Sequence, residues 1–128
     1  MNAPYHAHIY YEPQTRDAAA RLHRRFREAS STGDALGVLY VGDLRDRPLG
    51  PHPLPQFEIH FDAQTLPQVL AVLEPAGLRA LVHPLTYDDL ADHTTLARWI
   101  GAPLELDLSV LDPPGINQGI ARFGKSDF

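Results

Sequence analysis

The chain has 128 residues, enough for one domain, and its 44% hydrophobic content is enough for a buried core. Its net charge of −5 argues against nucleic acid as a partner, because phosphate binding depends on clustered Lys and Arg. The absence of cysteine excludes disulfides, thiolate metal sites and Cys nucleophiles, so a bound metal would need His and carboxylate ligands.

The sequence also predicts no segment that associates with a membrane. It contains no apolar run long enough for a transmembrane helix, and its N-terminus lacks the charged and apolar segments of a secretory signal, so we expect a cytoplasmic protein. Arginines cluster between residues 21 and 27, but they lie on a predicted amphipathic helix, which favours a solvated face over a binding surface.

The N-terminal part of the chain predicts a strand, a helix and a second strand. We expect a strand near 5–11, a helix near 15–29 and a strand near 36–42. The apolar face of the helix is formed by Ala18, Leu22, Phe26 and Ala29. A long loop over residues 43–55 follows, and its prolines are Pro48, Pro51, Pro53 and Pro55.

The same order of elements recurs in the middle of the chain. The expected elements are a strand near 56–62, a helix near 66–75 and a strand near 79–83. Thr65 and Gln68 predict a capping box at the start of the helix. Residues 8–15 and 58–65 align with each other and both end in Gln-Thr, which indicates a weak internal repeat.

Two strand–helix–strand units joined by an antiparallel step predict an α+β fold with a ferredoxin-like βαββαβ antiparallel sheet. The strand order in this arrangement is 4-1-3-2. Both helices are expected on one face of the sheet, and the other face is expected to be open.

Two further elements are expected after the second unit. Thr86 and Asp89 resemble a capping box at the start of a third helix near 88–100, and leucines alternate with acidic residues in a strand over 103–109. That strand would present an exposed edge, so we expect it to pair with a second subunit in a homodimer, with packing inside one chain as the alternative. The domain then covers residues 1–112, and residues 113–128 form a C-terminal tail.

Alternation along the strands places polar side chains on one face of the sheet. His8 and Tyr10 share a face of the first strand, and Glu58 and His60 share a face of the third. His83 has the corresponding position on the fourth strand. Because the first strand lies between the third and fourth, we expect His8 to lie close to His83 and to Glu58 or His60.

Two histidines outside the sheet extend this set. His52 lies between two prolines, which stiffen the backbone that presents its ring, although it could also be a turn residue that serves only the shape of the loop. His93 follows Leu90 at helical spacing and faces inward, either as a functional group or as a hydrogen-bonded core residue. We expect no role for His6, at a strand end, or for His23, on the basic helix.

Several motifs in a fixed order carry a resemblance to a known family. The matching stretches are Tyr5–Tyr11, Arg47–Pro53, Leu81–Thr86, Leu90–Thr94, Trp99–Gly101 and Pro103–Leu108. With these motifs the chain resembles the DOPA 4,5-dioxygenase family, small proteins that cleave catechol rings outside the two hydroxyls. The resemblance covers roughly residues 5–111. It implies the same ferredoxin-like fold and an extradiol dioxygenase that acts on a catechol such as DOPA with O2.

The residues then receive provisional roles. Two His and one carboxylate with open positions are typical of non-heme Fe(II) oxygenases, so Fe(II) is the expected cofactor, and the same ligand types suit Zn(II). The predicted metal ligands are His8, His52, His83 and Glu58, with His60 as the alternative to Glu58. His93 is the predicted acid/base, Tyr10 the predicted hydrogen-bond partner of the substrate, and Asp89 or Asp92 the group that orients a histidine.

Two other classes of function fit the same residues. One is a non-catalytic metal- or ligand-binding module that shares the architecture. The other is an enzyme of different chemistry, such as an isomerase or a hydrolase, that uses the same histidines. Oxygen consumption in the presence of a catechol separates all three.

Overall fold

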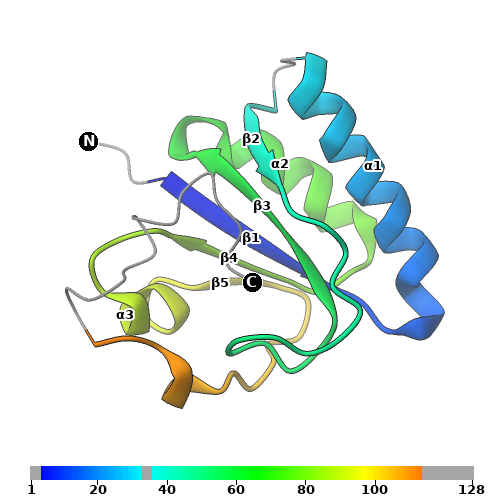
Figure 1. Cartoon of the computed structure of the whole chain (residues 1–128). Coiled ribbons are helices and arrows are strands. Elements are labelled where there is room, and N and C mark those ends of the chain that lie inside the picture. The colour runs from blue at the N-terminus through cyan, green and yellow to red at the C-terminus, as the bar shows by residue number, and fades with distance from the viewer. Residues whose placement is uncertain (1–3, 33–35, 114–128) are drawn as a thin grey trace.

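The computed structural model describes residues 4–32 and 36–113. Its described strands form one antiparallel sheet in the order β2-β3-β1-β4-β5 (Figure 1). The strands are β1 (Pro4–Tyr10), β2 (Val38–Val41), β3 (Gln56–Asp62), β4 (Ala80–Pro84) and β5 (Arg98–Ile100). The helices are α1 (Arg16–Thr32), α2 (Leu66–Leu73) and α3 (Asp89–His93). The predicted α+β fold and the predicted order of the first four strands are confirmed.

The two strand–helix units share a local design. Turns of 3-10 helix at Pro13–Thr15 and Ala63–Thr65 stand at corresponding positions, directly before α1 and α2. The capping box predicted from Thr65 does not form, because the Thr65 hydroxyl donates to the Asp62 carbonyl at 3.2 Å instead of capping α2. Helix α2 ends in a 3-10 turn and then at Gly77, whose φ of 79° is one that glycine adopts without strain.

Helices α1 and α2 pack on one face of the sheet and build the apolar core (Figure 1). The strand side chains on that face are Ala7, Ile9, Phe57, Ile59, Phe61, Ala80 and Val82, all at most 1% exposed. Phe26 of α1 and Val69 of α2 are fully buried against them. Each large apolar side chain buried in this way contributes about 1.5–3 kcal/mol, so this face carries most of the stability of the fold.

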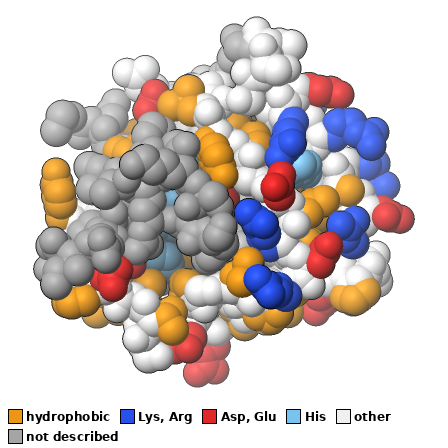
Figure 2. Space-filling view, viewed as in Figure 1, with side chains coloured by type: hydrophobic (Ala, Val, Ile, Leu, Met, Phe, Trp, Pro, Cys, Tyr) orange, Lys and Arg blue, Asp and Glu red, His pale blue; other side chains and the backbone are white. Residues whose placement is uncertain are grey.

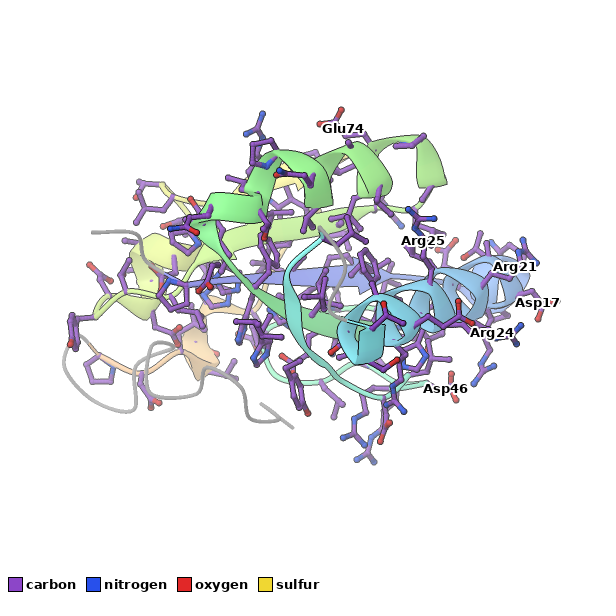
Figure 3. All side chains as sticks on the ribbon, turned by 90° about the horizontal axis from the view of Figure 1, so that it is seen from above. Asp17, Arg21, Arg24, Arg25, Asp46 and Glu74 are labelled. Atoms are coloured by element: carbon purple, nitrogen blue, oxygen red, sulfur yellow. The ribbon has the colours of Figure 1, made fainter. Side chains whose placement is uncertain are left out.

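The charged side of α1 is solvated, as predicted. Arg21, Arg24 and Arg25 are exposed along the outer side of the helix (Figure 3). Arg side chains are interspersed with Asp and Glu on part of the face shown in Figure 2. Within the described ranges, no helix is long and apolar enough to cross a membrane.

His23 is not the plain surface residue that the sequence suggested. Its side chain is half-buried, its Nε2 donates to the Gly42 carbonyl at 2.9 Å, and its ring meets the edge of Phe57. It therefore ties α1 to the end of β2 and has a structural function.

The predicted helix over 88–100 is wrong in its second half. Helix α3 ends at His93, where the Thr94 hydroxyl donates to the Leu90 carbonyl at 2.6 Å and the chain turns away. Residues 98–100 form β5 and pair with β4, with Ile100 opposite Ala80. Pairing satisfies the backbone groups on the free edge of β4, and this long-range gain outweighs one more turn of helix.

The predicted strand over 103–109 is also wrong. Residues 101–107 have no regular structure, and a 3-10 turn at Leu108–Val110 follows. β5 already occupies the edge of β4, and none of the described residues after β5 pairs with it as a further strand. Asp107 N instead donates to the Pro51 carbonyl at 2.9 Å. The edge-pairing reason for a homodimer is therefore lost.

The second face of the sheet is covered, contrary to the expectation of an open face. The loop over 43–55, α3 and residues 101–110 lie on that side, away from α1 and α2 (Figure 1). His8 and His83, expected on a solvated face, are both 1% exposed. The loop over 43–55 and the segment after the second unit together turn a sheet surface into an enclosed site.

Candidate functional site

Histidines and one carboxylate gather on the sheet face opposite α1 and α2. They come from β1, β3, β4, α3 and the loop over 43–55, and each is at most 8% exposed. The members of this histidine cluster are His6, His8, His52, Glu58, His60, His83 and His93. Burying so many polar groups costs free energy unless they bind each other or a ligand, so the cluster is unlike an ordinary core.

A short contact joins two of the predicted metal ligands, His8 and His83, whose Nε2 atoms lie 3.1 Å apart. His8 Nδ1 donates to Gln56 Oε1 at 3.2 Å, and His83 Nδ1 donates to the Pro84 carbonyl at 2.8 Å. Because a neutral imidazole carries one N–H, both Nε2 atoms then direct lone pairs at each other. Two such lone pairs repel unless a cation lies beside them, which fits a metal site.

A proton is a poor substitute for that cation. Burial, followed by the neighbouring imidazoles, holds the pKa of His8 and of His83 well below the usual value. The orientation of the Gln56 amide decides which ring nitrogen of His8 carries the proton. If the amide were rotated by 180°, its NH2 group would donate to His8 Nδ1, and His8 Nε2–H would then donate to His83 Nε2. With the Gln56 carbonyl oxygen toward His8 Nδ1, both Nε2 lone pairs stay available to a metal.

His52 reaches the cluster from the proline-rich loop. Its backbone N–H donates to the Leu49 carbonyl at 3.0 Å across a tight turn, in which Gly50 has a φ of 56°. The His52 and His8 rings lie 4.1 Å apart, and His52 Nδ1 shares a hydrogen bond of 2.6 Å with the Tyr10 hydroxyl. When the proton of this bond belongs to Nδ1, the Nε2 atom of His52 offers a further lone pair.

His93 lies at the rim of the cluster on α3. Asp88 caps this helix by accepting from Ala91 N at 3.1 Å. His93 Nδ1 donates to the Asp89 carbonyl at 2.7 Å, so its Nε2 also carries a lone pair. Its ring lies 4.4 Å from that of His83. Asp89 thus orients the ring as predicted, but through its backbone rather than through its carboxylate.

Asp92 has a different function from the one expected. Its carboxylate accepts from the Thr86 hydroxyl at 2.5 Å and from the Thr86 backbone N–H at 2.9 Å. The predicted capping box of Thr86 with Asp89 is therefore wrong, because Asp88 caps α3 and Thr86 binds Asp92. Burial raises the pKa of Asp92. These bonds fix α3, and with it His93, to the end of β4.

A cavity of about 300 Å³ opens beside His93. Its other lining residues are Thr94, Trp99, Leu104, Glu105, Leu106 and Leu108. The Trp99 ring stacks on Tyr10, with ring centres 6.0 Å apart and planes at 18°. The leucines predicted to line a strand therefore line a cavity, and its volume lies at the lower end of the range for small-molecule sites.

Glu58 belongs to the cluster but turns away from His8. The two residues are paired in the β1–β3 register, as expected from the strand order. The Glu58 Oε2 atom, however, lies 3.5 Å from His60 Nε2 and 3.9 Å from His6 Nδ1. The His6 and His60 rings stack with centres 3.6 Å apart. His6, for which no role was expected, thus stands in the middle of the cluster.

Within the described part of the chain, three groups have ligand atoms close enough to hold a metal. They are His6, His8 and His83; His8, His52 and His93; and His6, Glu58 and His60. In each group these atoms lie within 4.8 Å of one another. The predicted ligands His52 and His83 both neighbour His8, which is the member common to the first two groups.

Two residues of the site escaped the sequence prediction. Alternation places His6 on the same strand face as His8, but its position at the end of the predicted strand argued against a role. Gln56 lies two residues before Glu58 and points to the same face, where it holds His8. A glutamine has no chemical signature of its own, so only the register of β1 and β3 reveals its function.

The chain is similar to known proteins in sequence and in structure. The sequence profile of the Dopa 4,5-dioxygenase family matches residues 5–110. The chain is 32% identical over 112 residues to the DOPA 4,5-dioxygenase of Amanita muscaria, which covers 84% of this chain and 49% of that protein. It is 30% identical over 128 residues to an uncharacterized 21.2 kDa protein of Botryotinia fuckeliana, which covers 87% of this chain and 64% of that protein.

A solved structure is also similar. A protein of Nostoc punctiforme, provisionally assigned as a dioxygenase, has a TM-score of 0.71 and 34% identity over 85% of this chain and 90% of its own. The chain spans about half the length of the Amanita protein, at 49%, but nearly all of the Nostoc chain.

Proposed function

This chain belongs to the Dopa 4,5-dioxygenase family, and from that premise we propose that it is a metal-dependent extradiol dioxygenase that opens a catechol ring with O2. The observation that carries the proposal is the 3.1 Å separation of the buried Nε2 atoms of His8 and His83, whose Nδ1 atoms lie against the Gln56 amide oxygen and the Pro84 carbonyl. Few arrangements other than a metal site stabilise such a pair. DOPA is one catechol to test, because the Amanita relative is a DOPA 4,5-dioxygenase.

We propose that His8, His52 and His83 hold the metal, and that Glu58, which turns toward His60 and His6, is not one of its ligands. Iron(II) is the proposed metal, and zinc(II) suits the same ligands in a purified protein. When bound, the ion would supply the activation of O2 and the polarisation of the catechol oxygens. The hydrogen bonds to Gln56 and Pro84 fix the tautomers of His8 and His83, which keeps the Nε2 atoms available as ligands.

His93 is the proposed acid/base. Its Nδ1 is committed to the Asp89 carbonyl, so its Nε2 can take the proton of a catechol hydroxyl and return it to the product. It lines the 300 Å³ cavity and also adjoins His83, so it stands between the substrate and the metal ligands. His93 would thus carry the proton at the rim of the cluster, while the metal ligands lie at its centre.

The cavity supplies the proposed substrate site. Trp99 and Leu104 offer apolar surface against which an aromatic ring can pack and from which water is displaced. The Tyr10 hydroxyl, held at 2.6 Å from His52, is the proposed hydrogen-bond partner of a substrate hydroxyl. Burial raises the pKa of Tyr10, so this group remains a neutral donor throughout the physiological range.

The test is direct. The chain is purified without oxygen, loaded with Fe(II), and mixed with a panel of catechols in an oxygen electrode while the absorbance of a ring-opened product is recorded. Oxygen uptake that matches product formation supports the proposal. A chain that binds metal without oxygen uptake is a binding module, and turnover that consumes no oxygen indicates a different reaction.

A further inference from the structure

The proposed iron ligands use only part of the histidine cluster. His6, Glu58 and His60 remain, and all three are at most 3% exposed. His6 projects from β1, and the other two project from β3. Three ligating side chains of this kind, buried together, form a site whose chemistry the iron centre does not explain.

The two sets lie on opposite sides of β1. In the sheet order, β3 is the neighbour of β1 toward β2, whereas β4, which carries His83, is the neighbour toward β5. His6 faces His60 across one strand pair and His83 across the other. Neighbouring strands are about 4.8 Å apart, so there is room for two separate ions along this face.

The distances within the second set suit a metal. Ligands that bind at about 2.0–2.2 Å in a tetrahedral arrangement are roughly 3.3–3.6 Å from each other. The Oε2 atom of Glu58 lies 3.5 Å from His60 Nε2 and 3.9 Å from His6 Nδ1. One ligand atom from each of the three residues lies within 4.8 Å of the other two. The two rings stack with planes at 21°, so a rotation of one ring out of the stack is needed to aim both nitrogens at one ion.

Gly42 supports the position of the carboxylate. Its φ is outside the left-handed region, so its backbone conformation does not require glycine. A Cβ at this position would lie 3.0 Å from Glu58 Cγ and 3.6 Å from Glu58 Oε1. Gly42 N also donates to the Glu58 carbonyl at 2.8 Å, which fixes the two residues together. The absence of a side chain at residue 42 thus makes room for Glu58.

We propose that His6, Glu58 and His60 form a second divalent-cation site beside the iron site, so that the chain binds two metal ions. Two imidazoles and one carboxylate with open positions suit Fe(II), Mn(II), Co(II) or Zn(II). The count of two rests on the proposed first ion, whereas the second site stands on its own ligands.

The experiment counts ions in the metal-free full chain with Co(II) alone, under nitrogen and without substrate. Equilibrium dialysis with elemental analysis gives the stoichiometry, and visible absorption of Co(II) reports each coordination environment. We expect two ions for the wild type and for the control Glu74→Gln, at an exposed residue of the 3-10 turn directly after α2 (Figure 3). Glu58→Gln and His83→Ala should each bind one, with different Co(II) spectra because different ions remain.

A gentler variant guards against unfolding. Gly42→Ala leaves every ligand in place but crowds Glu58, and it should weaken the second ion at least tenfold without affecting the first. A single wild-type ion that is retained in Glu58→Gln, two ions in Glu58→Gln, or unchanged affinity in a folded Gly42→Ala would overturn the second site. This experiment contains no catechol or O2, so its result is independent of the oxygen-electrode test of ring cleavage. Binding of two ions by a chain that fails the ring-cleavage test would refute only the proposed function. Ring cleavage by a chain that binds a single ion would refute only the second site.

Discussion

Gln56 should control the metal affinity of the cluster through one hydrogen bond. Its Oε1 accepts from His8 Nδ1 at 3.2 Å, and its side chain is fully buried. Gln56→Leu removes the acceptor and keeps a similar volume. The His8 proton can then move to Nε2, the atom that faces His83, and the ring loses its fixed orientation.

The size of the effect follows from the structure. Groups that orient a metal ligand typically contribute 10–100-fold in affinity, or about 1.4–2.7 kcal/mol of binding free energy. The unpaired His8 N–H costs about 1–3 kcal/mol of folding stability. The backbone of Gln56 pairs with Arg45 in both directions, at 2.9 and 3.1 Å, and this pairing survives the substitution. We therefore expect a folded chain that binds metal more weakly.

The assay is competition with a chelator of known affinity for Co(II), in parallel with thermal unfolding. Gln56→Glu should restore the affinity or exceed it, because a carboxylate accepts the His8 N–H more strongly. Gln68→Leu, on the exposed side of α2, is the matched control. A folded Gln56→Leu chain that binds Co(II) within twofold of the wild type would refute the assigned tautomer of His8.

Four further predictions follow from the site. His83→Ala should cut metal content, whereas His93→Ala should retain the metal and lower turnover by about 10²–10⁴-fold. Circular dichroism verifies folding, the exposed Gln68→Leu is the control, and loss of metal in the His93 variant would make His93 a ligand. Tyr10→Phe should weaken the hold on His52 and raise KM for the catechol, and unchanged kinetics would remove it from the site. Burial lowers the pKa of several cluster histidines, so the unfolded chain binds more protons than the folded chain below about pH 6.5. The free energy of unfolding of the metal-free chain should therefore fall by up to about 1.4 kcal/mol per pH unit for each such histidine as pH falls. Equal free energies of unfolding in urea at pH 7.5 and pH 5.5 would contradict the burial of these rings. A homodimer stays a prediction, now on the exposed Leu108 rather than on a strand edge, and monomer mass in light scattering at all concentrations would refute it.

The division of the sheet into two faces was predictable because it depends on local periodicity. Side chains on a strand alternate, so Ile9 and Phe57 fall on the helix side while His8 and Glu58 fall on the other. The same rule covers His6. It was set aside for its place near the strand end, although β1 extends beyond it to Pro4.

The segment after residue 86 could not be predicted in the same way. Ile100 gains a strand partner only because the edge of β4 is free next to it, and that edge is set by residues some twenty positions away. Alternating leucines such as Leu104 and Leu106 fit a strand as well as they fit a cavity wall. A strand or a cavity wall forms according to which backbone groups are available for pairing nearby in the fold. A local sequence pattern carries no information about that availability.

The sequence by itself thus determined the family, the order of the first four strands and the convergence of His8 with His83, because all three depend on motifs and on alternation. Only the tertiary structure decided the enclosure of the site, the hydrogen bond from His8 to Gln56 and the turn of Glu58 toward His60. Alternation fixes the face on which a side chain lies, but not its rotamer or its tautomer. Those depend on which groups the register and the covering loops bring within hydrogen-bond distance.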